Sequence, residues 1–471
     1  MEKNHLTQEA SYRERLKEKF YPNVVKEVET FETDAKSGSE QSSLFESGEL
    51  SDGGSFAWTQ ALLCHLVMFS TWGVINSFGT FQHYYHATIL ADYDPSSISW
   101  IGSTQVFLLF FVGALTGHLS DMGFFRLLLF VGSAMIVVGM LITSFATGYW
   151  QLLFSQGICI GLGNGCLFCP SLSVLSTYFN RKRGIAMGIC ATGSATGGMV
   201  YSALFSRLLP AIGFPWTIRV AALIQLVCLT ACNLGLRQRV NPQKSSKIFD
   251  YSSLKDFPFI IFCLGLFFVS YLPRIYFSWI RYLIRLTVFL KNLWGIYFVA
   301  HYISLFATAI LGLSFQDSVN ILIVLNGVGI IGRILPNILA DYFLGSFNVL
   351  ILICICCGVL SFSWIFVTDR GGLYAWAAFY GMFSSGIQSI YPAALFNITK
   401  DLTKSGSRMG MFLTFISFTA LTGAPIAGEL VKRHGGKYLQ AQLFSGTTIM
   451  IGSGFLAVAR LLENRKLLVK L

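Results

Sequence analysis

The chain has 471 residues, of which 54% are hydrophobic, 15% aromatic and only 12% charged. In soluble domains about a quarter of all residues are charged, so this composition excludes an ordinary soluble fold and indicates a membrane protein. We attribute the formal net charge of +11 to cytosolic loops and to contact with anionic membrane lipids, and we expect no nucleic-acid-binding surface.

Residues 1–52 hold a large share of the charged side chains, so we expect a disordered cytosolic N-terminal tail. This segment lacks the basic start, apolar core and cleavage site of a signal peptide. The apolar run that begins at Phe56 is therefore expected to stay in the protein.

Apolar runs of about 20 residues, the length at which a helix crosses a bilayer, recur along the rest of the chain. Backbone polar groups in lipid must be paired within such a run, so the runs predict helices. The expected spans are 56–80, 98–118, 126–146, 150–175, 184–209, 216–236, a disturbed region at 257–310, 317–339, 348–368, 373–396, 409–429 and 440–462.

Counting 257–310 once, the sequence predicts an all-α membrane protein with twelve helices. The helices form two six-helix halves, at 53–237 and 257–465. A cytosolic loop at 238–256 joins the halves, and a short cytosolic end follows at 466–471.

The distribution of Lys and Arg orients these spans. Basic residues gather in loops on the side of the tail, whereas the loop around His83 to Pro95 has none. Lys432, Arg433 and Lys437 are exceptions, but the balance places both termini in the cytosol. We expect an integral multi-pass protein of the plasma membrane, with a vacuolar or other internal membrane as the alternative.

An internal repeat relates the two halves. The segment "GHLSDMGFFR" follows the second span and "RILPNILADYFLG" follows the eighth, so Asp121 and Asp341 occupy matching positions. Parallel halves are an architecture of secondary transporters. The first segment resembles the loop motif of the major facilitator superfamily, whose aspartate caps a neighbouring helix and latches one conformation. This resemblance implies a gating role for Asp121, Arg126 and Asp341.

Two further segments carry a narrower resemblance. "DGGSFAW", at Asp52 to Trp58, and "YFNRKRGIAMGICATGSATGG", which follows the fourth span, resemble motifs of the monocarboxylate transporter family within that superfamily. The resemblance covers about residues 52–465 and leaves the substrate open. It also places Arg181 and Arg183 among the gating residues, at the start of the glycine-rich fifth helix.

The glycines of the fifth helix have a packing explanation. Gly184 and Gly188, like Gly193 and Gly197, are four residues apart, so each pair lies on one face and lets another helix approach closely. The glycines of the span at 409–429 are the expected partner surface. These residues are interpreted as moving contact surfaces and not as ligands.

Eleven cysteines lie mostly inside spans, where thiols act as small apolar residues. Cys166 and Cys169 have a metal or redox spacing, but no second pair or His cluster accompanies them. We expect no metal site and no cofactor.

Arg333 is the sharpest candidate for binding an anionic group of the substrate. Burying an arginine in a membrane costs about 2.5–3.5 kcal/mol and requires a partner or an aqueous cavity. The side chain either lines a central cavity or lies near a helix end and reaches the phosphate region. We favour the cavity because Asn326 lies seven residues earlier on the same face.

Other polar and aromatic side chains inside spans either line the transport path or join helices. A histidine in a span is compatible with proton handling and equally with packing. The remaining substrate-binding candidates are Asn76, Asn164, Tyr297, His301, Gln388 and Tyr391.

The sequence departs from the family at two positions. Animal members that move lactate with a proton carry a Lys in the first helix and an Asp one turn before the Arg of the eighth helix. Asn76 and Gly329 stand at these positions here. The resemblance is therefore to fungal members with varied cargoes, and proton coupling stays open.

Residues 269–291 place Arg274, Arg281, Arg285 and Lys291 where the seventh helix is expected. The segment is either an interfacial helix or a translated intron, because Val-Ser can be encoded by a sequence that resembles a splice donor. We favour the intron, since excision joins two apolar runs into one uninterrupted span.

We find no histidine-rich box, nucleophile elbow or phosphate-binding loop, so neither an enzyme nor an ATP-driven pump is expected. The sequence predicts a secondary active or facilitative transporter that moves a small organic acid or related metabolite by alternating access. The alternative is a transport-inactive receptor or sensor of the same fold. Replacing Arg333 separates them, because a carrier would lose flux and a scaffold would lose folding.

Overall fold

The computed structural model describes residues 54–179, 183–238, 290–398 and 405–463. The chain divides into two units, Met1–Gly54 and Ser55–Leu471, and the helices belong to the second unit. The expected tail at 1–52, most of the central loop and residues 269–289 lie outside the described residues.

The first half of the helical unit contains six membrane passes. Its elements are α3 (Ser55–Asn76), α4 (Phe78–Ala87), α5 (Pro95–Leu119), η1 (Ser120–Phe124), α6 (Phe125–Thr143), α7 (Tyr149–Leu152), η2 (Leu153–Cys159), α8 (Ile160–Ser176) and α9 (Arg183–Gly235). Two of these passes are composite, since α4 continues α3 beyond Ser77 and α8 continues α7 and η2. Gly213 divides α9 into two passes, because its φ of 74° lies in the left-handed region that glycine adopts without strain.

The second half begins with α12 within the described residues. Its elements are α12 (Leu290–Ala309), α13 (Phe315–Leu339), η4 (Ala340–Leu344), α14 (Ser346–Ser363), η5 (Trp364–Phe366), α15 (Arg370–Ile398), α16 (Ser405–Arg433) and α17 (Leu439–Glu463).

In the part of the chain that the structure describes, nine helices are long and apolar enough to cross a membrane. One of them, Gly184–Gly235, makes two passes because it is broken at Gly213. With α12 and α15, these helices account for twelve passes and confirm the prediction of an all-α, multi-span fold. The first pass extends to Ala87 and not to residue 80, because the polar and aromatic side chains of α4 hide a helix that hydropathy alone ends too early.

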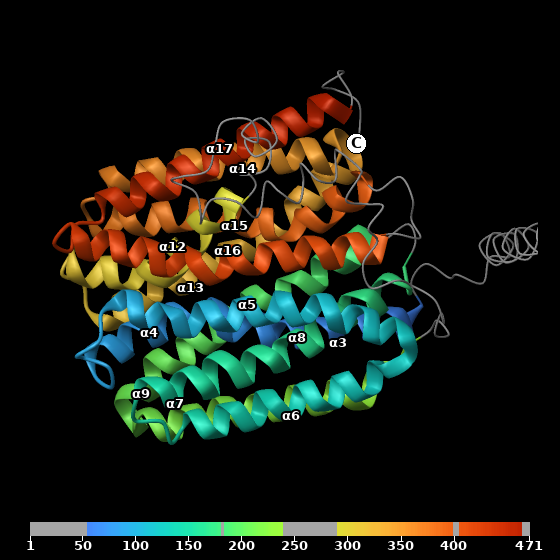
Figure 1. Ribbon diagram of the computed structural model, residues 1–471, viewed down its shortest axis with the longest axis horizontal. Coiled ribbons are helices and arrows are strands. Elements are labelled where there is room, and N and C mark those ends of the chain that lie inside the picture. The colour runs from blue at the N-terminus through green and yellow to red at the C-terminus, as the bar shows by residue number, and fades with distance from the viewer. Residues whose placement is uncertain (1–53, 180–182, 239–289, 399–404, 464–471) are drawn as a thin grey trace, which may run out of the picture. The chain divides into compact units, whose positions relative to one another are not determined.

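Each half is a bundle built around close helix pairs. In the first half α3 packs against α9, and α5 packs against α8. In the second half α13 packs against α15, and α14 packs against α17 (Figure 1). The two halves meet along two further pairs, α5 with α16 and α9 with α13. These four helices therefore form much of the interface between the halves.

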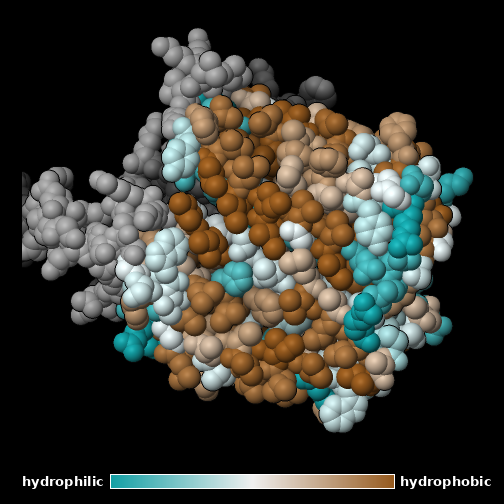
Figure 2. Space-filling view, turned by 180° about the vertical axis from the view of Figure 1, so that it is seen from behind, coloured by the Kyte–Doolittle hydropathy of each residue, from teal (hydrophilic) through white to brown (hydrophobic). Residues whose placement is uncertain are grey.

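The outer surface is largely apolar. Phe145 is 70% exposed and Phe366 is 81% exposed. Figure 2 shows hydrophobic side chains over most of one face, with hydrophilic side chains gathered toward its edges. Such a surface is suited to lipid, where helices satisfy their own backbone groups.

The helical unit has two ends, called the Asp94 end and the Asp341 end after a residue that lies at each. The Asp94 end holds the loop between α4 and α5 and the turn after α16, and the Asp341 end holds η4 and the start of α9. In the orientation expected from the loop charges, the Asp94 end faces away from the cytosol.

Candidate substrate-binding site and gate

Arg333 is buried in α13, with 2% of its surface exposed. Its Nη1 donates to the Ser385 hydroxyl of α15 at 3.0 Å and to the Gly329 carbonyl at 3.3 Å. Within the described residues both acceptors are neutral, and no carboxylate forms an ion pair with the guanidinium. The positive charge of Arg333 is therefore available to an anionic ligand.

Gly329 gives Ser385 the space beside the guanidinium. A Cβ built on Gly329 would collide with the Ser385 hydroxyl and would lie 3.0 Å from Nη1 of Arg333. A larger residue at 329 therefore cannot coexist with Ser385 in this arrangement. Ser385 occupies the space next to Arg333 that the resemblance assigns to an aspartate.

A second set of hydrogen bonds fixes the next turn of α13. Asn337 donates to the Ser389 hydroxyl at 2.7 Å and to the Arg333 carbonyl at 2.7 Å. Ser389 itself donates to the Arg333 carbonyl at 2.9 Å. Ser385 and Ser389 are four residues apart on one face of α15, so both hold α13 in register.

Asn326 and Arg333 lie where the two halves meet. The Asn326 amide donates to the Leu322 carbonyl at 2.9 Å, and its Oδ1 lies 2.7 Å from the Cβ position of Gly198 in α9. The Arg333 carbonyl is the atom nearest to the Cβ position of Gly188, at 3.9 Å. The Asn326 side chain therefore faces the other half, and the backbone of Arg333 lies near it, whereas the Arg333 guanidinium bonds to Ser385 of its own half.

The remaining predicted residues have different environments. Asn76 donates to the Ser194 carbonyl at 3.1 Å, which ties α3 to α9 inside one half. Asn164 is fully buried in α8, and neither its Oδ1 nor its Nδ2 has a hydrogen-bond partner among the described residues. Gln388 and Tyr391 are half-buried on α15, where the Tyr391 ring lies 5.4 Å from that of Phe412.

Tyr297 and His301 are both buried in α12. The Tyr297 carbonyl lies 2.8 Å from Nδ1 of His301. Across the interface, the His301 ring is 5.0 Å from the ring of Phe78 in α4. The structure thus brings His301 into contact with the other half, away from the hydrogen bonds of Arg333.

A polar cluster around His65 was not predicted. Its Nδ1 lies 3.0 Å from the Ile189 carbonyl and 3.2 Å from the Thr192 hydroxyl, and its Nε2 lies 3.1 Å from the Thr196 hydroxyl. The side chain is half-buried between α3 and α9. The only sequence signal was the four-residue spacing of the two threonines, and their histidine partner is more than 120 residues away.

The gating candidates are only partly described. Asp341 is an exposed residue of η4, and its Oδ2 lies 2.5 Å from the Cβ position of Gly184, in the first turn of α9. A carboxylate at a helix N-terminus is stabilised by the helix dipole, so this contact between halves fits a latch. Arg126 donates to the Asn233 carbonyl at 2.8 Å and so joins α6 to α9.

Less is described of the other gating candidates. Asp121 lies in η1 and Arg183 begins α9, but their side chains are outside the described residues, as is the whole of Arg181.

The glycine pairs of α9 face two different helices. The Cβ position of Gly193 meets the His65 carbonyl, and that of Gly197 meets the backbone of Phe69, both in α3. Gly184 instead faces Asp341 of η4, and Gly188 faces Arg333 of α13. The expected partner surface at 409–429 was wrong, since α16 packs on α5. Glycine spacing predicts close approach but does not identify the approaching helix.

Comparison with known proteins decides the family. A model of the Major Facilitator Superfamily matches residues 61–394. The chain belongs to the Major Facilitator Superfamily. Over 412 residues, 87% of this chain and 88% of the relative, it is 40% identical to a Gibberella zeae protein named MFS-type transporter.

Two other fungal relatives are named as efflux proteins. The chain is 32% identical over 408 residues to the aspyridones efflux protein apdF of Emericella nidulans, covering 86% of this chain and 78% of the relative. It is 32% identical over 407 residues to the agnestins efflux protein AgnL12 of Paecilomyces divaricatus, covering 86% and 87%. The chain is therefore an integral, multi-pass membrane transporter, as predicted.

The two halves of this superfamily transporter are joined at the Asp94 end. Among the residues that the structure describes, four polar contacts and two ring contacts cross the interface there, so this end is closed. The contacts are Asp94–Lys432 (2.5 Å), Ser96 hydroxyl to Pro425 carbonyl (2.8 Å), Tyr302 hydroxyl to Pro95 carbonyl (3.1 Å), Gln316 amide to Ser206 hydroxyl (3.2 Å), and the ring pairs His301–Phe78 (5.0 Å) and His83–Phe315 (4.9 Å).

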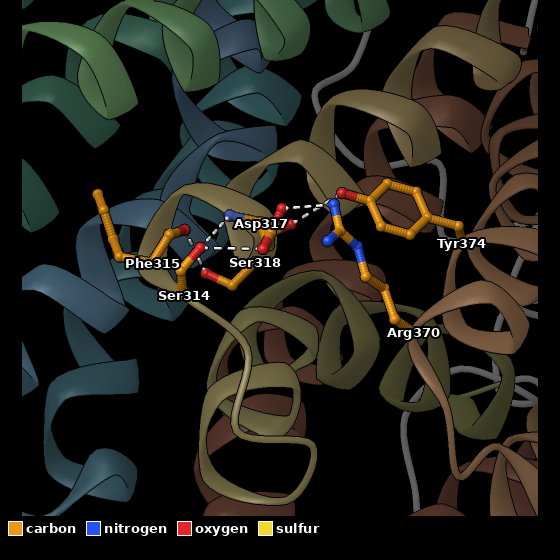
Figure 3. A network of polar contacts seen from close by, with 6 residues as sticks. All are labelled: Ser314, Phe315, Asp317, Ser318, Arg370 and Tyr374. Atoms are coloured by element: carbon orange, nitrogen blue, oxygen red, sulfur yellow. Dashed lines mark hydrogen bonds and ion pairs between the residues drawn. The ribbon is translucent and has the colours of Figure 1, made fainter.

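The first turn of α13 is held rigidly beside these contacts. Ser314 caps the helix by accepting from the Asp317 amide at 3.1 Å. The Asp317 carboxylate pairs with Arg370 of α15 at 2.8 Å, and the Tyr374 hydroxyl donates to the Asp317 carbonyl at 3.3 Å (Figure 3). The transporter thereby fixes the residues of α13 that touch the first half to the start of α15.

Proposed function

We propose that the transporter exports a small organic acid or a related amphiphilic metabolite by alternating access, as a fungal-type member of the monocarboxylate transporter family. The efflux names of two relatives support the direction. The two motifs at the first and fifth helices support the subfamily. The plasma membrane is the proposed location.

The observation that carries this proposal is the guanidinium of Arg333, which is buried and has no carboxylate partner among the described residues. A carboxylate beside it would accept charge-assisted hydrogen bonds, which are about twice as strong as neutral ones. The attraction also grows as the surroundings lose water, because the effective dielectric constant falls. Asn326, on the same face, adds an amide for the uncharged part of the cargo.

The neutral surroundings of Arg333 bear on proton coupling. Where a carboxylate pairs with an arginine, a proton must first neutralise the carboxylate before the arginine is free for an anion. Ser385 holds no such charge, so anion binding at Arg333 needs no proton. A proton step, if the transport cycle has one, belongs to another residue.

The test is the stabilisation of purified transporter by anions, together with efflux from preloaded vesicles. A ligand that binds only the folded transporter raises its melting temperature, and the increase is larger the further the ligand concentration exceeds Kd. We expect aromatic carboxylates such as 4-hydroxybenzoate to raise it and the matching amide, 4-hydroxybenzamide, to have little effect.

Arg333→Gln should abolish both the stabilisation by the acid and its efflux, whereas Arg333→Lys should keep part of each. Arg433→Gln is the matched control, because it removes an exposed arginine that pairs with Glu429 of its own helix. Stabilisation and efflux that are undiminished in Arg333→Gln would show that another residue binds the anion.

A further inference from the structure

Two histidine–phenylalanine contacts cross the interface in opposite directions at the Asp94 end. His301 of the second half lies against Phe78 of the first, and His83 of the first half lies against Phe315 of the second. Both pairs must separate when this end opens. The two histidines differ in burial, since His301 is 2% exposed and His83 is half-buried.

The surroundings of the two ring nitrogens of His301 define the tautomer of its neutral form. Nδ1 lies 2.8 Å from the Tyr297 carbonyl, which can only accept, so Nδ1 carries the hydrogen. Nε2 is buried and has no hydrogen-bond partner among the described residues. The Cβ position of Gly102 in α5 lies 2.8 Å from this nitrogen, so the backbone of the other half closes over it.

A protonated imidazole carries N–H groups on both nitrogens. In the closed arrangement the second N–H would be buried without an acceptor, and a charged group left unpaired costs more than a neutral one. The closed Asp94 end therefore accommodates neutral His301 and opposes the cation. Opening withdraws Phe78 and α5, which lets water hydrate Nε2.

We propose that His301 is a proton-binding residue of the transport cycle: it takes a proton from water when the Asp94 end opens and returns it before that end closes. The proton moves between bulk water and Nε2, and no other group is required. This inference rests on the alternating access of the proposed function and is independent of Arg333 as the anion site.

Within the described residues, the carboxylates on the helices next to His301 are already paired with other cations and do not serve as its counter-charge. Asp317 of α13 is paired with Arg370, and Glu429 of α16 is paired with Arg433 at 2.9 Å. The titratable groups on elements packed against α12 or His301, within the described residues, are His83, Tyr84, Tyr85 and His86 of α4, His118 of α5, Asp317 and Arg333 of α13, Glu429, Lys432 and Arg433 of α16, and Arg460 of α17, with Tyr297 and Tyr302 on α12 itself.

The proposal is tested by measuring how readily the Asp94 end opens at different pH values. Ser99 of α5 is fully buried in the closed state, whereas Ala91 in the preceding loop is exposed. The maleimide labelling rate of Ser99→Cys, divided by that of Ala91→Cys at the same pH, reports the open fraction. The unsubstituted protein serves as the blank for its native cysteines.

Because one proton is bound on opening, the ratio of open to closed states should rise about tenfold from pH 7.5 to pH 5.5, given that an exposed histidine titrates near 6.5. In His301→Gln the ratio should change less than twofold over this range. His434→Gln is the matched control and should keep the tenfold change, since the His434 side chain, in the turn after α16, is exposed while the Asp94 end is closed.

Several outcomes would overturn the proposal: a pH-independent ratio in the parent protein, a retained tenfold change in His301→Gln, or its loss in His434→Gln. The stabilisation of His301→Gln by 4-hydroxybenzoate checks that this variant is folded. Arg333→Gln should lose that stabilisation and keep the pH response, so the two proposals fail separately. Failure of Ser99→Cys to react at any pH would refute the alternation that both assume.

Discussion

The side chain next to Arg333 determines whether the site carries a net charge. The Ser385 hydroxyl accepts a hydrogen bond from the guanidinium and adds no charge, and Gly329 leaves room for this hydroxyl. The sequence predicted Arg333 because an arginine inside an apolar span is costly. It did not predict Ser385, which is 52 residues away on another helix.

Restoring a carboxylate should therefore weaken anion binding. We expect Gly329→Asp combined with Ser385→Ala, which removes the colliding hydroxyl, to lower the affinity for 4-hydroxybenzoate at pH 7 by tenfold or more, about 1.4 kcal/mol. The reason is that the new carboxylate neutralises Arg333.

The matched control is Gly329→Asn with Ser385→Ala, which has nearly the same shape without the charge. Titration of the melting temperature with ligand measures both affinities. Equal losses in the two double variants would attribute the effect to packing and not to charge.

At the scale of helices, the contact of α3 with α9 depends on glycine. The Cβ position of Gly193 meets the His65 carbonyl, a backbone atom that cannot move aside, whereas that of Gly188 has its nearest neighbour at 3.9 Å. Sequence spacing treated the two glycines alike. Only the packing distinguishes a glycine that is required from one that is tolerated.

We expect Gly193→Ala to destabilise the protein by about 1–3 kcal/mol, the usual cost of overpacking. Gly188→Ala should leave the stability nearly unchanged. The melting temperatures of the purified variants measure the difference, and an unchanged value for Gly193→Ala would mean that α3 moves away from α9 at little cost.

Gly102 plays the corresponding role between halves. A methyl group there would lie 2.8 Å from Nε2 of His301, a contact between halves that exists only while the Asp94 end is closed, and 2.6 Å from the Phe78 ring of its own half. Gly102→Ala should therefore favour the open state and raise the labelling of Ser99→Cys at pH 7.5 severalfold. Gly188→Ala provides the comparison at a contact between halves that has room. Labelling no faster in Gly102→Ala than in the parent would show that the interface adjusts while closed.

For the whole molecule, the ion pair between Asp94 and Lys432 explains an irregularity in the loop charges. Lys432 and Arg433 are basic residues at the end where the positive-inside rule expects none, but each is paired, with Asp94 and Glu429 respectively. Their carboxylate partners offset the charge. The pairing of Lys432 was not predictable, because Asp94 is 338 residues away.

Lys432→Asp should replace this attraction by repulsion and open the Asp94 end. The pair is about half exposed, so water and salt screen the interaction and the ratio of open to closed states should change only a few-fold. The exchanged pair, Asp94→Lys with Lys432→Asp, should restore the parent ratio in the Ser99→Cys assay. A double variant as open as the single one would show that these charges do not hold the end closed.

The segment at 269–291 remains a prediction about the whole chain, since residues 269–289 lie outside the described residues. We expect a transcript that lacks these codons and a product that transports better than the full chain, because four basic side chains are removed from the seventh helix. Transcript sequencing and efflux assays of both forms provide the measurement. A long form that is the sole product and transports normally would make the segment a genuine part of the transporter.

The fold was largely predictable because lipid imposes long apolar helices whose limits are written in local sequence. The break at Gly213 lies in the predicted gap between the spans 184–209 and 216–236, and Arg333 lies inside the predicted span 317–339, whereas the break at Ser77 was not predicted. The contacts of the gate were not predicted either, because Phe78 and His301, or Gln316 and Ser206, meet only after the halves pack together.

The length of α13 has a mechanical consequence. Its first turn bears Phe315 and Gln316, while Arg333 lies 17 residues beyond Gln316, or about 25 Å along the helix at 1.5 Å per residue. A tilt of about 10° pivoting at Arg333 would displace the first turn by about 4 Å over that length. This exceeds what a 3.2 Å hydrogen bond between Gln316 and Ser206 can follow. With cargo at the proposed Arg333 site, α13 would act as a lever, since a small rotation there becomes a large displacement of its distant first turn.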